Sequence, residues 1–354
     1  MFLPKFTISQ TVLKNIGVID ASREVIASLS LSESWKDRLR KKALEETIFY
    51  TLSLEGLRLP EDYFNSENRE EDFFDKHVEN FKQTLSLIDE ASRQFKEKET
   101  YFLTGDILLS LHQSISEGLI SPERSGALRV RQIAIKNALT GEVTYSPPPA
   151  AEVPYIIEDL INWINSPEGK ETHPIIKASI IHFEVYRIHP FSEFNSSIAV
   201  LLSLLLLSLD NYSIDEFFSF SEFFDATVGD YHKILQEVGG KEDEETGEHD
   251  LTEWVEYYTK GLTLKILELK EKAKSVAKES KATDHLGEQI ELSERQVAIL
   301  DYLKKHGSMR NKDFRKIFPD FSDDTVLREM KFLKKKGLVK KEGGTKKATY
   351  VLGQ

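Results

Sequence analysis

The chain has 354 residues, contains no cysteine and carries a net charge of −12 at pH 7. This length predicts two or three domains with a substantial core, and the lack of cysteine excludes disulfides, Cys-ligated zinc and thiol catalysis. The charge is uneven, because residues 291–354 hold 16 Lys and Arg against 9 Asp and Glu, a balance of +7, whereas the other residues sum to −19. A basic tail on an acidic body indicates that only the tail meets nucleic acid.

No targeting or membrane segment is expected. The first residues lack the basic start, the long apolar stretch and the small-residue cleavage site of a signal peptide. The apolar run from Ile198 to Leu209 is too short, at about 1.5 Å per residue, to cross a hydrocarbon layer of ~30 Å. We interpret it as a buried central helix. Because the chain also lacks cysteine, we expect a cytoplasmic protein without a membrane partner.

Helical periodicity dominates the acidic body. Residues 34–54 combine charged and apolar positions at helical spacing and end at a glycine, which is a common stop signal. Thr104 precedes a second segment whose apolar residues recur every three or four positions. Further helices are predicted over 152–164 and 175–188, and Pro190 cannot continue the second of these.

A small β-hairpin is predicted between these helices. Val130 to Ile135 alternates in polarity, Gly141 marks a turn and Val143 to Tyr145 can return as a second strand. Three consecutive prolines, 147–149, close this segment. Further on, a long charged helix from Leu251 to about Lys281 leads out of the body.

The sequence of the tail, residues 291–354, predicts three helices followed by a β-hairpin. Ser293 caps the first helix, which ends at Gly307, a short helix follows over 311–318, and a third runs over 323–336. Alternation over 338–352 predicts the hairpin. This order resembles a winged helix-turn-helix.

A winged helix would place its third helix in the major groove of DNA. We expect the DNA contacts at Ser322, Thr325, Arg328 and Lys331, with Lys346 and Lys347 of the hairpin on phosphates. Acidic residues near the start of the third helix argue against DNA. The alternatives are a winged helix that contacts protein, or a solvated lysine face without a partner.

The segment most informative about chemistry joins the helix over 175–188 to the apolar helix. His189, Pro190 and Phe191 follow the first helix, and Glu193 and Asn195 precede the second. An imidazole with an ordinary pKa of about 6.5 suits proton abstraction from a hydroxyl. The start of the next helix offers unpaired backbone N–H groups to a phosphate.

This segment resembles the signature of the Fic family, HPFx[D/E]GNGRxxR. Residues 126–129, with the hairpin and its prolines, are similar to the flap that aligns substrates in that family, and 250–254 resembles its DLTxW element. Thr51, Glu55 and Gly56 match the family's inhibitory [S/T]xxxE[G/N] helix, here N-terminal to the core.

The resemblance implies a mainly α fold, a Fic-type helical bundle with a β-hairpin flap, and transfer of AMP from ATP to a protein hydroxyl in the presence of Mg²⁺. The acceptor would be a target protein or the chain itself, and a homodimer is possible. By position, the implied roles are general base for His189, metal ligand for Glu193, phosphate contacts for Asn195, Ser196 and Ser197, and inhibition for Glu55.

The chain departs from the signature at four positions. Phe194 and Ser196 stand where the family has glycines, and Ser197 and Val200 replace its two arginines. Phe does not readily adopt φ > 0, and the loss of one charge-stabilising donor typically slows catalysis about 100- to 1,000-fold. We therefore expect AMP transfer to be severely weakened.

Several residues keep alternative interpretations. The inhibitory Glu normally holds a motif arginine, so Glu55 is expected to lack a partner, and it can equally belong to a glycine-capped helix end. His189 can be a helix-terminal His bonded to a carbonyl or carboxylate. Arg129 either lines the cleft or forms a structural ion pair. His182, about 10.5 Å of helix rise away from His189, is interpreted as a packing residue.

The predicted domains are 1–95, a helical region with the inhibitory-like helix; 96–265, the Fic core; 266–290, a connecting helix and linker; and 291–354, the winged helix. Three functions follow from this organisation. The chain is an AMP-transferring enzyme with an altered motif, a non-catalytic scaffold through which the winged helix responds to a nucleotide or partner, or a dimerisation platform for a DNA-binding regulator.

Overall fold

The computed structural model describes residues 2–29, 31, 33–65, 73–97, 102–136, 141, 143–212, 217–241, 249–279, 281–283, 286, 289–310, 313–318, 322–343 and 349–353. The chain divides into two compact units. The first unit comprises Met1–Arg23 and Leu39–Glu268, and the second comprises Glu24–Arg38 and Leu269–Gln354.

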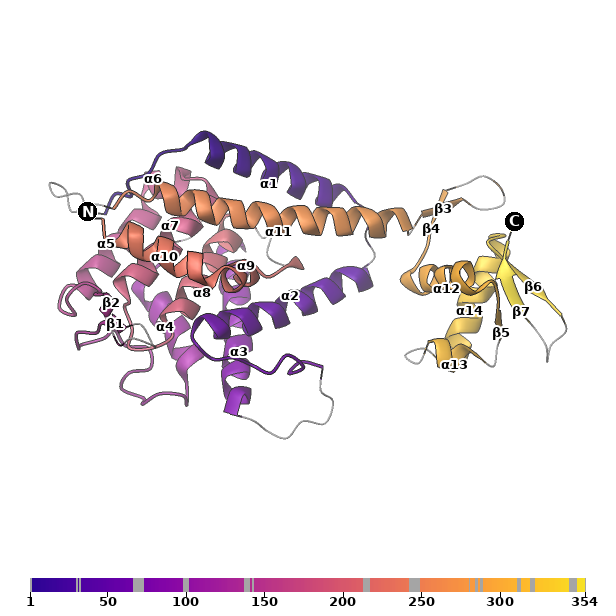
Figure 1. The fold of residues 1–354 in the computed structure, drawn as a ribbon, viewed down its shortest axis with the longest axis horizontal. Helices are drawn as coiled ribbons and strands as arrows, with labels where there is room; N and C mark the ends of the chain where they lie inside the picture. The colour runs from indigo at the N-terminus through magenta and orange to yellow at the C-terminus, as the bar shows by residue number, and fades with distance from the viewer. Residues whose placement is uncertain are drawn as a thin grey trace. The chain divides into compact units, whose positions relative to one another are not determined.

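Helices build the first unit (Figure 1). Their bounds are α1 Gln10–Ser28, α2 Glu33–Leu54, α3 Phe73–Glu97, α4 Gly105–Ser116, α5 Val153–Asn165, α6 Pro167–Glu171, α7 Pro174–Ile188, α8 Asn195–Leu209, α9 Ser221–Ala226, α10 Val228–Gly239 and α11 Thr252–Glu279, of which α1, α2 and α11 continue into the second unit. The mainly α class predicted from the sequence is confirmed. The predicted hairpin is present as well, since β1 (Ile135–Lys136) pairs antiparallel with β2 (Val143–Tyr145).

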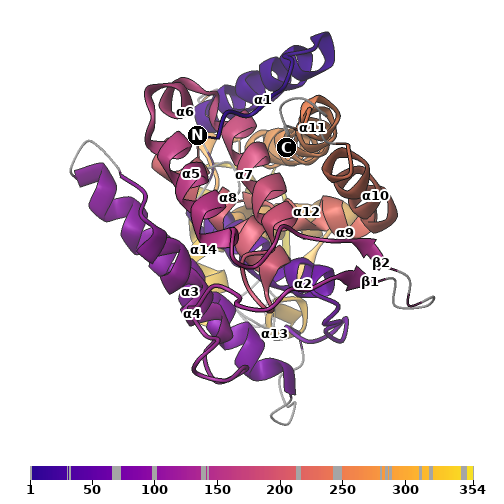
Figure 2. The ribbon, with the colours of Figure 1, turned by 90° about the vertical axis from the view of Figure 1, so that its left-hand side faces the viewer.

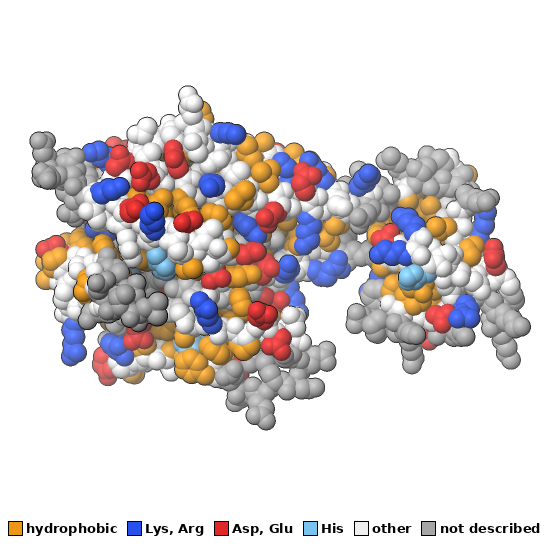
Figure 3. Space-filling view, viewed as in Figure 1, with side chains coloured by type: hydrophobic (Ala, Val, Ile, Leu, Met, Phe, Trp, Pro, Cys, Tyr) orange, Lys and Arg blue, Asp and Glu red, His pale blue; other side chains and the backbone are white. Residues whose placement is uncertain are grey.

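Helices α7 and α8 form the centre of this unit, with the other helices around them (Figure 2). Nearly every residue of both helices is buried, which confirms that the apolar run over Ile198 to Leu209 is a buried central helix. None of the described helices combines the length and apolarity that a membrane crossing requires. The surface in turn carries the charge, and acidic and basic side chains are intermixed on the face shown in Figure 3.

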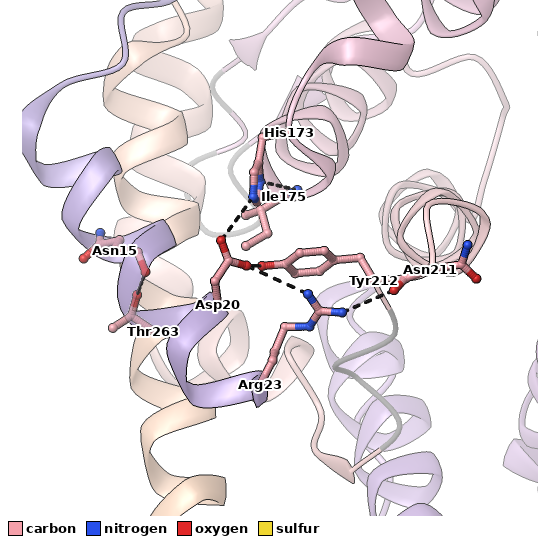
Figure 4. A network of polar contacts seen from close by, with 8 residues as sticks. All are labelled: Asn15, Asp20, Arg23, His173, Ile175, Asn211, Tyr212 and Thr263. Atoms are coloured by element: carbon pink, nitrogen blue, oxygen red, sulfur yellow. Dashed lines mark hydrogen bonds and ion pairs between the residues drawn. The ribbon is translucent and has the colours of Figure 1, made fainter. Parts of the chain in front are cut away.

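Polar contacts attach α1 to the ends of α7 and α8 (Figure 4). The hydroxyl of Tyr212 donates to Asp20 of α1, and Nε2 of His173 lies 3.6 Å from Asp20 Oδ2. The guanidinium of Arg23 lies 3.6 Å from the centre of the Tyr212 ring and donates to the Asn211 carbonyl at 3.2 Å. These contacts hold α1 on the bundle although α1 buries few apolar side chains.

The second unit contains short helices and strands. Their bounds are β3 Lys281–Thr283, β4 Gln289–Glu291, α12 Glu294–His306, β5 Met309–Arg310, α13 Phe314–Ile317, α14 Asp323–Lys335, β6 Val339–Glu342 and β7 Thr349–Leu352. Strand β7 pairs antiparallel with β5 on one side and with β6 on the other. Ser293 and Gln296 form a capping box at the start of α12, where Ser293 was predicted to cap the helix. The predicted hairpin corresponds to β6 and β7, whereas β5 and the β3–β4 pair were not predicted.

Candidate active site

The loop from His189 to Phe194 joins α7 to α8 and is closed by one side chain. Asn195 is buried, and its Oδ1 accepts a hydrogen bond from the Phe191 N–H at 3.0 Å while its Nδ2 donates to the Phe191 carbonyl at 3.0 Å. Both ends of the amide are therefore used by the loop. Of Asn195, only the backbone N–H is therefore available for the phosphate contact that the sequence predicts.

Phe194 adopts the left-handed conformation of a glycine, with φ 64° and ψ 22°. This conformation costs an L-residue about 1–2 kcal/mol. The ring is buried, with centroids 6.0 Å from His77 and 6.4 Å from His112, and burial of a Phe side chain contributes about 1.5–3 kcal/mol. Phe194 thus adopts φ > 0 against the expectation from its residue type, because packing of the ring offsets the strain of the backbone.

His112 of α4 clamps the loop, and sequence reasoning missed it. Its Nδ1 accepts a hydrogen bond from the Gly126 N–H at 3.0 Å, so its Nε2 is the atom that donates to the Glu193 carbonyl, at 3.3 Å. The ring stacks on Phe191 at 3.8 Å. Burial lowers the pKa of His112 to about 4, so the ring is neutral near pH 7. A histidine on an otherwise apolar helical stripe was the available signal.

His189 ends α7 with φ 46° and carries a defined tautomer. Its Nδ1 lies 2.5 Å from the Tyr186 carbonyl, which only accepts, so Nδ1 carries the proton and Nε2 carries the lone pair. Burial lowers the pKa of His189 to about 4. Among the described residues, none forms a hydrogen bond with Nε2. Nδ1 of His189 thus bonds to a carbonyl at the helix end, as one alternative predicts. Nε2 stays available as a base.

Arg129 is buried and holds the end of α7 against the flap. It donates to the carbonyls of His189 at 2.7 Å, Pro148 at 2.6 Å and Ile188 at 3.3 Å. Neither predicted alternative, a cleft-lining residue or a structural ion pair, describes these contacts. Arg129 instead neutralises the carbonyl end of a helix, where positive charge is stabilising.

Glu193 points outward from the loop and contacts an arginine. Its Oε1 lies 2.8 Å from Nη1 of Arg124, and the two side chains are 46% and 51% exposed. A magnesium ion bound with phosphates needs only one or two protein carboxylates, and an accessible carboxylate beside the start of α8 fits that need. Glu193 therefore suits the metal role that was predicted for it.

The carboxylate of Glu55 lies at the N-terminus of α8. Its Oε1 accepts a hydrogen bond from the Ser197 N–H at 2.6 Å, and the Ser196 N–H also stabilises the charge. Burial raises the pKa of Glu55, although these hydrogen bonds act against the rise. The expectation that Glu55 lacks a partner is wrong, because it considered only side chains and the partner is backbone.

Comparison with known proteins identifies the core of the first unit. Residues 102–207, which contain the flap, α7, the loop and most of α8, match the model of the Fic/DOC family. This segment is a Fic/DOC family domain.

The fold of the Fic/DOC domain and its surroundings recurs in solved structures. A Fic family protein from Desulfovibrio desulfuricans has a TM-score of 0.67 and 18% identity, with both chains covered completely. A Fic domain-containing signaling protein from Bacteroides thetaiotaomicron has a TM-score of 0.57 and 20% identity over 76% of this chain and 97% of its own. At these identities the likeness shows the fold alone.

Relatives of the Fic/DOC domain carry a functional name. Proteins named protein adenylyltransferase Fic from Drosophila ananassae and Aedes aegypti are each 23% identical to this chain, over 204 and 203 residues. Each match covers 56% of this chain and 39% of the relative. The aligned part is thus well under half the length of these relatives.

Two further residues of the Fic/DOC domain, Val200 and His182, are buried and do not line an accessible site. Val200, where the signature has its second arginine, is buried in the core. His182 is buried too, and its Nε2 lies 2.9 Å from the Tyr231 hydroxyl with the ring against Trp254, which agrees with its interpretation as a packing residue. Of the two histidines 182 and 189, His189 is therefore the one that lies at the loop.

The predicted DNA contacts of the second unit lie partly within the described residues. Arg328 and Lys331 are exposed on α14, and Thr325 is half-buried in its first turns. Lys346 and Lys347 lie outside the described residues. Glu329, an acidic residue of α14, accepts a hydrogen bond from Gln296 of α12 at 2.7 Å, so its charge is partly engaged inside the unit.

Proposed function

We propose that the first unit binds ATP at the N-terminus of α8 and transfers AMP to a protein hydroxyl, of a target protein or of the chain itself. The observation that carries this proposal is the Glu55 carboxylate on the Ser197 N–H. The N-terminus of a helix is a site for anions, and here an anion of the chain itself occupies it, one loop away from His189. The name of the relatives, protein adenylyltransferase Fic, supports the same activity.

In this reaction His189 is the general base. The oxygen of the target hydroxyl attacks the α-phosphorus of ATP, its proton passes to Nε2 of His189, and the bond to the β-phosphate breaks so that pyrophosphate leaves. The hydrogen bond from Nδ1 to Tyr186 keeps Nε2 unprotonated and fixes the ring. Mg²⁺ bound at Glu193 would stabilise the charge on the leaving phosphates.

Phe194 supports the proposal because its positive φ preserves the backbone course of a glycine at the phosphate-binding loop. A left-handed residue followed by helical residues directs successive N–H groups to one side, which forms an anion-binding concavity. Asn195, Ser196 and Ser197 supply these N–H groups in the proposal.

Two features make the proposed transfer slow. Ser197 and Val200 bring no positive charge to the phosphates. In addition, the Glu55 carboxylate competes with the phosphates for the N–H groups at the start of α8. Glu55 directly follows helix α2, and the Thr51 hydroxyl of that helix lies 2.8 Å from that of Ser221 of α9, which anchors the end of α2 near the competing carboxylate. We infer an inhibitory role for Glu55 that acts on backbone N–H groups.

Self-labelling with ATP that carries a label on the α-phosphate tests this function. We expect weak or no label on the wild-type chain, label on Glu55→Gly, and none on Glu55→Gly combined with His189→Ala. Label that survives His189→Ala would refute the role of His189. If folded Glu55→Gly binds ATP without labelling itself or proteins of a cell extract, the unit is a non-catalytic nucleotide-binding scaffold.

The second unit supports a separate function, binding of duplex DNA through α14. The order helix, strand, helix, helix, strand, strand with β7 between β5 and β6 fits a winged helix. Arg328, Lys331 and Lys335 recur on one exposed side of α14 at helical spacing. A gel shift of the full chain with a broad DNA library at low salt tests this function, and the absence of any shift would remove it.

A further inference from the structure

The geometry points to Arg124 as the residue that supplies, from outside the motif, the positive charge that the motif lacks at Ser197 and Val200. Arg124 would bind the phosphates of the nucleotide. This inference rests on the proposed function and names a residue of that site.

The guanidinium of Arg124 is already directed at the motif loop. Its Nη1 lies 2.8 Å from Oε1 of Glu193, and its Nε donates to the Ser121 hydroxyl at 3.3 Å. With 51% of its side chain exposed, Arg124 is also accessible to a ligand. Two contacts thus orient the planar fork that suits bidentate recognition of phosphate.

The backbone that carries Arg124 is clamped to the motif loop independently of this ion pair. His112 accepts from the Gly126 N–H and donates to the Glu193 carbonyl, so one ring joins the two segments. The Ser125 hydroxyl lies 2.9 Å from that of Ser116 of α4. Arg124 therefore stays beside the loop when Glu193 releases it.

Two anion-binding groups at the site are each occupied by a carboxylate of the chain. Glu55 lies on the N–H groups at the start of α8, and Glu193 lies on Arg124. Burial is the main cause of the raised pKa of Glu55, and the negative charge of Glu193 raises it further. The two carboxylates therefore repel each other electrostatically. A triphosphate that replaced both would gain Arg124 and would free Glu193 for Mg²⁺.

Equilibrium binding of ATP and of adenosine to Arg124→Gln in the Glu55→Gly background tests the inference. Loss of one charge-assisted contact predicts ATP binding about 10- to 100-fold weaker, with adenosine binding unchanged. Arg124→Lys keeps the positive charge but not the planar fork, so its affinity for ATP should fall less than that of Arg124→Gln. Arg93→Gln is the matched control, since Arg93 is exposed and donates to the Asp89 carbonyl of its own helix.

A second measurement separates phosphate binding from a structural role. Without divalent metal, Glu193→Gln should strengthen ATP binding because it releases Arg124, and this gain should vanish when Arg124→Gln is added. Equal weakening of ATP and adenosine by Arg124→Gln, or ATP binding that it leaves unchanged, would overturn the inference alone. If Glu55→Gly binds no ATP, the proposed function falls, and the inference falls with it.

Discussion

The Glu55 carboxylate accepts a hydrogen bond at 2.6 Å from the backbone N–H of Ser197, which lies 142 residues further along the chain. An anion on the first turn of a helix is stabilised by the free N–H groups and by the helix dipole. The start of α8 therefore holds a carboxylate of the chain itself, although both arginines of the signature are replaced.

The raised pKa of Glu55 makes stability depend on pH. Because its folded-state pKa lies above the unfolded value, the stabilisation from proton uptake is complete below the unfolded pKa of about 4.3 and is lost as pH rises through the folded value. We expect the free energy of unfolding of the wild-type chain, relative to Glu55→Gln, to increase as pH falls from 7 to about 4.3. Urea unfolding at a series of pH values measures this difference. A difference independent of pH would contradict the raised pKa.

Replacements of Phe194 separate ring packing from backbone strain. Removal of the buried ring costs about 3–5 kcal/mol, so Phe194→Ala and Phe194→Gly should both lower the free energy of unfolding. Glycine relieves the positive φ of 64°, so Phe194→Gly should be about 1–2 kcal/mol more stable than Phe194→Ala. Thermal or urea unfolding of the two variants provides the comparison. Equal stabilities would show that the left-handed conformation stores no strain.

His112→Phe should uncouple the motif loop from the segment before the flap. The substitution keeps a ring on Phe191 but leaves the part-buried Gly126 N–H and Glu193 carbonyl without their partner, and the loss of one hydrogen bond typically costs about 0.5–1.5 kcal/mol. We expect a lower free energy of unfolding and faster hydrogen exchange at Gly126. Exchange as slow as in the wild-type chain would show that His112 does not hold this segment.

Substitutions on α14 should change the salt dependence of DNA binding. If Arg328 and Lys331 each contact a phosphate, each substitution by alanine should reduce the slope of log K against log salt by about 1. Lys304→Ala is a suitable control, because Lys304 lies on α12 and pairs with Asp301 at 3.4 Å. Slopes that stay at the wild-type value in both α14 variants would exclude these contacts.

The sequence predicts much of the fold because its periodic segments are long. The apolar run that becomes α8 and the proline break after α7 are visible in the pattern of residues. Strand β5 was not predicted, since two residues, Met309 and Arg310, carry no readable alternation. The tautomer of His189 could not be predicted from the sequence either, because it depends on the position of the Tyr186 carbonyl at the end of a helix.

The site shows where residue-by-residue comparison with a family signature fails. The signature has glycine at Phe194 because of the positive φ, whereas in this chain ring contacts with His77 and His112 stabilise Phe194 there. The signature provides an arginine side chain as the partner of Glu55, whereas the partner in this chain is a backbone group. In both cases the deciding contact comes from a helix that is distant in sequence.

The affinity for ATP of the wild-type chain and of Glu55→Gln tests the central claim most directly. The two side chains are nearly equal in size, but the amide carries no charge to compete with a phosphate for the Ser196 and Ser197 N–H groups. We predict that Glu55→Gln binds ATP about 10- to 100-fold more tightly, the equivalent of one charge-assisted contact, and that both proteins bind adenosine equally. Equal ATP affinities would mean that Glu55 does not occupy the phosphate site.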